Sequence, residues 1–169
     1  MESLKLEIPN GTHQQEYERI MDKWEAWEEN IQPELMRRGK TSYDKWLEYC
    51  EDDCTTASML STKIPATLYF LMNEKQEIIG GIVINNADTK RGHLHAGIVP
   101  WHRGKGYGTT MLTLALKECK KMGISKVHIC PNSRENKAAI QTILNNGGRL
   151  LNEFKENEVW FERYEISII

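Results

Sequence analysis

Apolar residues in the first third of the chain recur at helical spacing. The first stripe predicts an amphipathic helix, and a capping box formed by Thr12 and Gln15 predicts where it begins. The members of this stripe are Tyr17, Ile20, Met21, Trp24 and Ile31. Two shorter helices are predicted next, the second beginning after Thr41, and the polar segment 51–58 predicts a loop. We therefore expect a helical N-terminal part over about 12–55.

The rest of the chain alternates short apolar runs with helical stripes. Helices are predicted from the glycine-rich segment 101–110 to Gly123, where lysines precede a C-terminal glycine, and over 136–144. Strands are predicted at 66–72, 77–85, 93–99, 126–130, 149–155 and 158–168. This order is typical of a mixed α/β (α+β) domain with at least one parallel crossover. A single domain is expected over 1–169, with a core at about 66–148 and a C-terminal hairpin at about 149–168.

Composition narrows the class of protein. The chain is 40% hydrophobic and 27% charged, and its net charge is −2, so no basic field favours nucleic acid or an anionic membrane as a partner. No stretch approaches the roughly 18 apolar residues that span a bilayer. The first ten residues lack the pattern of a signal peptide. We expect a cytoplasmic protein.

The four cysteines predict no metal site. Cys50 and Cys54 form a C-x₃-C pair, but no second pair and no nearby histidine completes a zinc set. Cys119 and Cys130 lie within apolar runs and are interpreted as small core residues.

The segment "WHRGKGYGTT" at 101–110 carries the strongest chemical signal. Closely spaced glycines before a helix let backbone N–H groups converge on an anion, and Arg103 and Lys105 add charge. A Walker loop is excluded because Gly108 is followed by Thr109 and Thr110, not by lysine. A dinucleotide fingerprint is excluded because the spacing is G-x-G-x-G and the next strand ends in "HICPN" without a carboxylate.

Read as R-x-x-G-x-G, residues 103–108 resemble the acetyl-CoA-binding signature of the GCN5-related N-acetyltransferase (GNAT) superfamily. The "IVP" at 98–100 and the "NKAA" at 136–139 match two further motifs of that family. The "NGG" at 146–148 falls where such chains have a glycine followed by an aromatic residue. The resemblance covers about 66–168 and is closest to a bacterial branch of predicted acetyltransferases.

The resemblance implies a mixed, mostly antiparallel sheet flanked by helices, with two central parallel strands that splay apart. It also implies acetyl-CoA as co-substrate. The pyrophosphate would sit on the amides of the loop, the pantetheine would pair with the strand before it, and Asn136 would lie near the cofactor. The implied cofactor-binding residues are Gly97, Ile98, Val99, Arg103, Gly104, Lys105, Gly106, Tyr107, Gly108, Thr109 and Asn136.

The implied reaction is direct attack of a primary amine on the thioester within a ternary complex. A backbone N–H of Ile98 or Val99 would contact the thioester carbonyl and stabilise its oxyanion. His95 is the candidate general base, as histidines on this strand act in some members of the family. His93 is a weaker candidate. The tyrosine that many members use as general acid is replaced by Ile143.

The acceptor stays open: a small amine, an amino acid or antibiotic, or a protein amine. The oligomeric state stays open as well, with a homodimer as one option. Acidic residues in the helical part, such as Glu25, Glu28, Glu29 and those at 51–53, either favour a cationic acceptor or form a solvated helix face. Two alternative functions remain: a non-catalytic acyl-CoA-binding or sensing module on the same fold, and a nucleotide-binding regulator.

Overall fold

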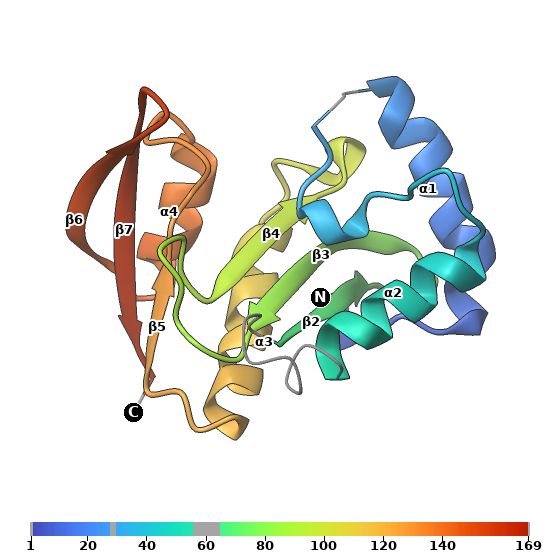
Figure 1. The fold of residues 1–169 in the computed structure, drawn as a ribbon, viewed down its shortest axis with the longest axis horizontal. Coiled ribbons are helices and arrows are strands. Elements are labelled where there is room, and N and C mark those ends of the chain that lie inside the picture. The colour runs from blue at the N-terminus through green and yellow to red at the C-terminus, as the bar shows by residue number, and fades with distance from the viewer. Residues whose placement is uncertain (1, 28–29, 56–64, 169) are drawn as a thin grey trace.

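In the computed structural model, which describes residues 2–27, 30–55 (the backbone alone for 52–55) and 65–168, a seven-stranded sheet has the order β1-β2-β3-β4-β5-β7-β6 (Figure 1). Neighbouring strands are antiparallel except β4 and β5, which are parallel. The strands are β1 (Lys5–Glu7), β2 (Ala66–Met72), β3 (Ile78–Asn85), β4 (Leu94–Ile98), β5 (Lys126–Ile129), β6 (Arg149–Glu156) and β7 (Val159–Ser167). The predicted mixed, mostly antiparallel sheet is thus confirmed.

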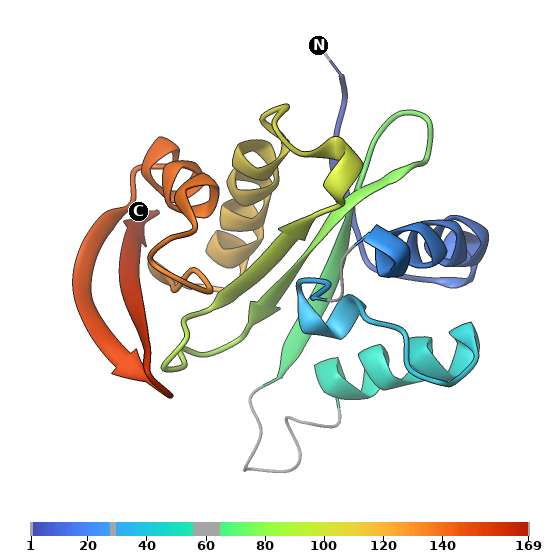
Figure 2. The same ribbon diagram turned by 90° about the horizontal axis from the view of Figure 1, so that it is seen from above.

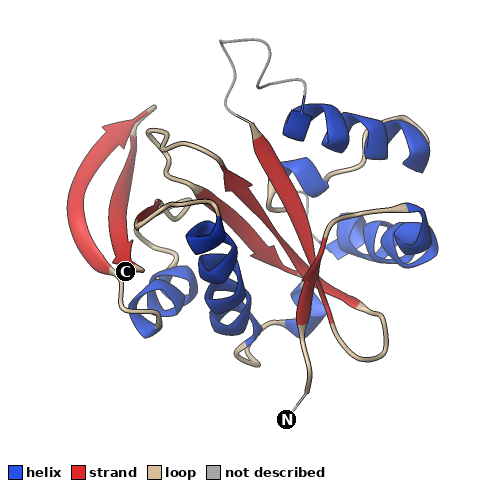
Figure 3. Ribbon diagram, turned by 90° about the horizontal axis from the view of Figure 1, so that it is seen from below, coloured by secondary structure: helices blue, strands red, loops and turns tan. Residues whose placement is uncertain are grey.

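Helices cover both faces of the sheet. Figure 2 shows α1 and α2 on one side of β2–β4, with α3 and α4 on the other side, and Figure 3 shows the same layers from below. The helices are α1 (Gln14–Trp27), α2 (Tyr43–Thr55), α3 (Tyr107–Lys121) and α4 (Lys137–Asn145), with short 3₁₀ turns at Gly11–His13, Glu34–Met36 and Pro100–His102.

The two layers bury two apolar clusters. One lies between the sheet and α1 and α2, where Tyr17, Trp46 and Phe70 stack on one another. The other lies under α3 and α4 and includes Ile82 and Leu94. Because β3 is buried on both faces, its sequence is an unbroken apolar run rather than an alternating one.

Three local predictions are wrong. The N-terminal cap is Asn10, whose side chain accepts the N–H of Thr12, while the His13 imidazole accepts the N–H of Asn10. Strand β1 was not predicted, because three residues give no periodic signal. The expected loop at 51–58 is helical as far as Thr55, and residues 56–58 lie outside the described part.

The parallel strands β4 and β5 pair through a single register position, Leu94 opposite Ile129. Beyond this pair β4 continues to Ile98, whereas β5 ends at Ile129. The expected splay between the central parallel strands is therefore present. Within the described ranges no helix is long and apolar enough to cross a membrane.

Candidate functional site

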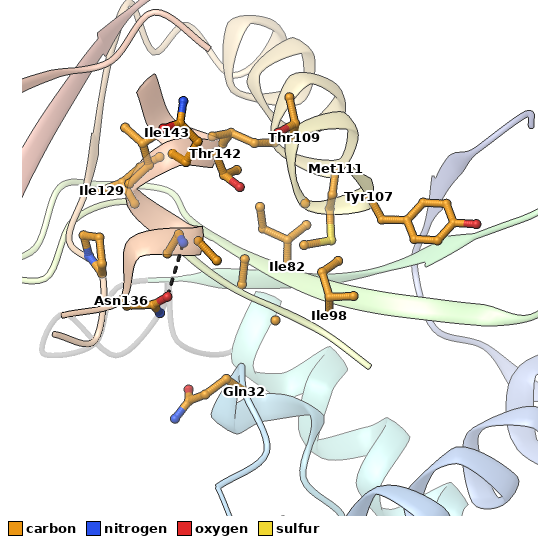
Figure 4. A pocket seen from close by; sticks show the side chains of 18 of the residues that line it. Gln32, Ile82, Ile98, Tyr107, Thr109, Met111, Ile129, Asn136, Thr142 and Ile143 are labelled. Atoms are coloured by element: carbon orange, nitrogen blue, oxygen red, sulfur yellow. Dashed lines mark hydrogen bonds between the residues drawn. The ribbon is translucent and has the colours of Figure 1, made fainter. Parts of the chain in front are cut away.

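A cavity of about 740 Å³ lies where β4 and β5 part. Its wall combines β4, the glycine loop, the first turns of α3, most of α4, the segment 129–132, and the residues Asn30 and Gln32. In Figure 4 Gln32 lies on one side of the strand that carries Ile98, and Thr142 and Ile143 lie on the other. The cavity thus joins the two faces of the sheet, and its volume is typical of a small-molecule or cofactor site.

The glycine loop forms the part of the wall at the start of α3. Gly104 and Gly106 have φ angles of +78° and +82°, which only glycine adopts at little cost, and a Cβ at either would meet nothing within 4 Å. Gly106 is also the N-cap of α3 and provides no side chain to cap the first turn. The first N–H groups of a helix have no partner within it, so this end attracts an anion.

Close packing between α3 and α4 fixes the loop relative to the second half of the cavity. A Cβ at Gly108 would lie 3.3 Å from the Thr142 hydroxyl, so a larger residue would push the helices apart. The side chain of Asn146 donates to the carbonyls of Thr109 and Thr142, and Thr113 donates to Asn146. These bonds join the two helices directly behind the loop.

The backbone of β4 presents alternate residues to β3 and to the splay. Val99 donates its N–H to the carbonyl of Ile79, and His93 accepts the N–H of Asn85. Along a strand the backbone groups of successive residues point to opposite sides. Because His93 and Val99 bond to β3, the even-numbered residues of β4, including Ile98, direct their N–H and C=O groups away from β3. The Ile98 carbonyl accepts Arg103 Nε at 2.9 Å. The expectation of a Val99 N–H contact is thus corrected: that N–H is already bonded within the sheet.

The side chains of the loop point in different directions. Arg103 lines the cavity, whereas Lys105 does not. The Tyr107 hydroxyl donates to the carboxylate of Glu2 at 2.6 Å, and its ring points away from the cavity (Figure 4). Hydrogen bonding to this carboxylate raises the pKa of Tyr107. Tyr107 therefore offers the cavity its backbone, while its side chain anchors the N-terminal segment.

His95 lines the cavity on the α1 and α2 side of the sheet. It lies opposite Val83, which belongs to the cluster on that side, and shares its face with Gly97. A Cβ on Gly97 would lie 1.9 Å from the Gln32 carbonyl oxygen, so the segment that carries Gln32 packs directly on β4. Burial lowers the pKa of His95, and the nearby Arg91 lowers it further. His95 is therefore neutral at neutral pH.

Asn136 and Ile143 occupy opposite ends of α4, and both line the cavity. The Asn136 side chain accepts the N–H of Ala139 at 3.2 Å and so caps the helix (Figure 4). Ile143 is 2% exposed and packs in the cluster under α3. Its side chain is a hydrocarbon, so it cannot act as the general acid that a tyrosine at this position would provide.

Several lining residues were missed by sequence reasoning. Asn30 and Gln32 come from an irregular segment without periodic signal. Cys130, interpreted as core, is buried but lines the cavity, and burial raises the pKa of its thiol. His102 also lines it, with both ring nitrogens buried and without partners in the described residues. Burial lowers the pKa of His102, so this ring is neutral.

Asp88, His93 and His128 lie at the base of the splay, with ligand-type atoms within 4.8 Å of one another. His93 Nδ1 accepts the N–H of His128 at 3.0 Å, and Arg163 forms a short ion pair with Asp88. His128 Nε2 contacts the Glu165 carboxylate at 3.0 Å. A nitrogen already used as an acceptor and a carboxylate already paired with arginine suit a hydrogen-bonded ionic cluster better than a metal site.

The acidic residues of the helical part do not act as one group. Glu25 contacts Arg38 at 2.6 Å, and Asp22 contacts the same guanidinium. The hydrogen bonds that Arg38 donates to these carboxylates raise its pKa. The charge of Glu25 is therefore partly compensated by Arg38, which it shares with Asp22. Residues 28–29 and the side chains at 52 and 53 lie outside the described part.

Comparisons with known proteins identify the family and the fold of the chain. The model of the Acetyltransferase (GNAT) family matches residues 17–145. One similar solved structure is RimL, a ribosomal L7/L12 alpha-N-protein acetyltransferase in complex with coenzyme A, with a TM-score of 0.72 and 16% identity over 98% of this chain and 94% of that chain. No curated protein sequence matches the chain.

Two further structures share the fold. The Salmonella typhimurium acetyl transferase that modifies the N-terminal serine of ribosomal protein L7/L12 has a TM-score of 0.69 and 16% identity over 99% of this chain and 96% of that chain. A chimera of spermidine N-acetyltransferase SpeG from Vibrio cholerae and hSSAT has a TM-score of 0.65 and 15% identity over 97% and 95% of the respective chains. With a family model that spans most of its length, the chain belongs to the GNAT family of acetyl-CoA-dependent N-acetyltransferases.

Proposed function

We propose that the protein binds acetyl-CoA in the cavity at the splay and transfers the acetyl group to a primary amine by direct attack within a ternary complex. The observation that carries this proposal is the glycine loop. Gly104 and Gly106 hold left-handed conformations, nothing lies within 4 Å of their missing Cβ atoms, and the uncapped start of α3 follows directly. These features fit a pyrophosphate, which needs converging N–H groups and close access.

The cofactor would be held by groups on both sides of the splay. Its pyrophosphate would contact the backbone from Arg103 to Thr109, and Asn136 would lie beside it. The pantetheine would pair with the free edge of β4, where the alternation of the strand directs the Ile98 N–H toward the splay. This N–H would stabilise the charge that develops on the thioester oxygen.

His95, which lines the cavity on the α1 and α2 side, would accept a proton from the amine. An alkylammonium has a pKa of about 10 and must lose a proton before it attacks. His95 is neutral because burial lowers its pKa, so its ring can take that proton, directly or through water. The attacking nitrogen loses a second proton as the amide forms. The departing CoA thiolate takes up a proton from water, because the side chain of Ile143 cannot donate one.

The amine would enter from the α1 and α2 side, where Asn30, Gln32 and His95 line the cavity. The similar structures include enzymes named for spermidine and for a ribosomal protein N-terminus. An acceptor screen should therefore contain polyamines, peptides with a free α-amino group, and amino acids.

Calorimetry and thermal unfolding with acetyl-CoA, CoA, ATP and NAD test the cofactor. A ligand at about 100 times its Kd stabilises the folded state by roughly 2.7 kcal/mol, which gives a visible shift. Stabilisation by acetyl-CoA and CoA alone is expected, followed by thiol release in the presence of an amine. No shift with either would overturn the proposal.

Binding of acetyl-CoA without thiol release for any amine would favour the alternative function. Ile143 supports that alternative, because it removes the usual proton donor from the cavity wall. The protein would then bind or sense acyl-CoA rather than transfer the acyl group.

A further inference from the structure

Arg91 is a cation at the base of the splay that neither the loop nor the proposed mechanism uses. Its guanidinium lies 3.8 Å from the centroid of the Phe161 ring, so stacking fixes its plane. Its Nε is buried and has no hydrogen-bond partner among the described residues. An arginine held in this way is oriented in advance but not fully satisfied.

The position of Arg91 follows from its neighbours. The next residue, Gly92, forms an isolated bridge with Ile129 at the end of β5, one residue before Cys130. The charge of Arg91 acts on both His95 and Cys130, which line the cavity from β4 and from the end of β5. Arg91 therefore lies near the end of β5, next to residues that line the cavity, although it is not itself among them.

Neighbouring cations are already paired, in contrast to Arg91. Arg163 forms a short ion pair with Asp88 and donates to the carbonyls of Thr89 and Lys90. Lys90 contacts Glu156 at 2.8 Å. Within the described residues Arg91 has no carboxylate at ion-pair distance, and its known contacts are an aromatic ring and a thiol. A planar guanidinium whose Nε has no hydrogen-bond partner among the described residues matches a carboxylate best, since the two can form parallel hydrogen bonds.

We propose that Arg91 forms an anion subsite at the acceptor side of the cavity, and that the acceptor is a primary amine that also carries a carboxylate. The carboxylate would bind the guanidinium while the amine reaches the thioester beside His95. This inference rests on the proposed acetyltransferase function. It excludes a cationic acceptor, which was one of the two interpretations of the acidic residues in the helical part.

Three matched series of acceptors test the subsite: ω-amino carboxylates, the corresponding ω-amino carboxamides, and diamines, each with two to six carbons. Within a series the distance from the amine to the second group varies. Between series the second group changes from an anion to a neutral group of nearly the same shape and then to a cation. At the best length we expect kcat/KM to be at least tenfold higher for the carboxylate than for the carboxamide, with the diamine lowest.

The variant Arg91→Gln should reduce this preference to about twofold, mainly through a higher KM for the carboxylate. At a pH above the catalytic limb of both proteins, kcat/KM for the carboxamide should change little. Lys90→Gln is the matched control, because it removes the same charge from the adjacent residue, whose side chain pairs with Glu156. It should keep the wild-type preference. Equal rates for carboxylate and carboxamide, or a preference for diamines, would overturn the subsite.

A binding measurement separates failure of the subsite from failure of the proposed function. With CoA bound, calorimetry would compare N-acetyl-ω-amino carboxylates with their carboxamides in the wild-type protein and in Arg91→Gln. Tighter carboxylate binding that is lost in Arg91→Gln supports the subsite even without turnover. Turnover without any such difference supports the acetyltransferase and rejects the subsite.

Discussion

The imidazole of His93 takes the place of a backbone carbonyl between the parting strands: its Nδ1 accepts the N–H of His128 at 3.0 Å, and the His93 N–H donates to the His128 carbonyl at 2.7 Å. These two bonds lie next to Leu94 and Ile129, the single register pair of β4 and β5. His93 thereby helps to fix the point where the cavity opens, and it is not free to act as the base.

Replacing His93 by leucine should lower the free energy of unfolding by about 1–3 kcal/mol, because the buried N–H of His128 loses its acceptor. His93→Asn should recover much of this loss, since Oδ1 of asparagine lies two bonds from Cβ, as Nδ1 does. Urea unfolding of the three proteins measures the difference. Equal stability of the leucine and asparagine variants would contradict the proposed role of the hydrogen bond.

Stability should also fall in mild acid. Burial lowers the pKa of His93, His95 and His102, so between each lowered pKa and the unfolded value of about 6.5 the unfolded chain binds more protons than the folded one. The free energy of unfolding should therefore be constant above about pH 7 and decrease as the pH falls below 6.5. Urea titrations from pH 5 to 8 test this, and His93→Asn should reduce the slope.

The same depressed pKa sets the expected pH profile of catalysis. If His95 is the base, kcat/KM should decrease as the pH is lowered, because the base becomes protonated. The midpoint of this decrease should lie below pH 6.5, the value for an ordinary histidine. This limb should be missing in His95→Ala, which should keep only part of the activity. The acceptor adds its own ionisation to both profiles, so the comparison must use one amine. Identical profiles would exclude His95.

Arg91 and Glu34 are the charged groups whose effects on His95 oppose one another: Arg91 lowers its pKa and Glu34 raises it. Removing the cation in Arg91→Gln should therefore move the catalytic limb to higher pH. A limb that stays in place, measured with a carboxamide acceptor, would show that Arg91 does not influence the base.

Gly106→Glu should abolish CoA binding while the protein stays folded. The substitution puts a side chain and a negative charge where the pyrophosphate of CoA would bind. A Cβ added at this glycine would meet no other atom within 4 Å, so the side chain itself causes no clash. The positive φ of +82° should cost about 1–2 kcal/mol of stability. Gly123→Glu is the matched control, with the same φ and open space at the other end of α3. Calorimetry with CoA compares the two, and unchanged binding in Gly106→Glu would remove the loop from the site.

Gly97→Ala should disturb the site from the other face. The added methyl group would lie 1.9 Å from the backbone oxygen of Gln32, so the segment that carries Gln32 must move. We expect a loss of about 1–3 kcal/mol and a higher KM for the acceptor. Urea unfolding and steady-state kinetics measure both effects. A variant as stable as wild type with an unchanged KM would show that this segment does not shape the acceptor side.

Local patterns in the sequence determined most elements of this fold and the loop of the site. The apolar stripes of α1 and α3 and the runs of β2 and β3 each follow from the period of their own residues. The glycine loop was also predictable, because left-handed φ angles and an uncapped helix start depend on residues within a few positions of one another.

The rest depends on contacts between distant parts of the chain, which no local period records. Tertiary packing brings Gln32 onto Gly97, stacks Arg91 on Phe161 and moves Cys130 from an apparent core strand into a cavity wall. Sheet pairing bonds the Val99 N–H to Ile79 and leaves Ile98 facing the splay. Local sequence therefore predicts where the candidate phosphate cradle lies, whereas tertiary packing alone assembles the proposed acceptor side, because its residues lie far apart in the chain.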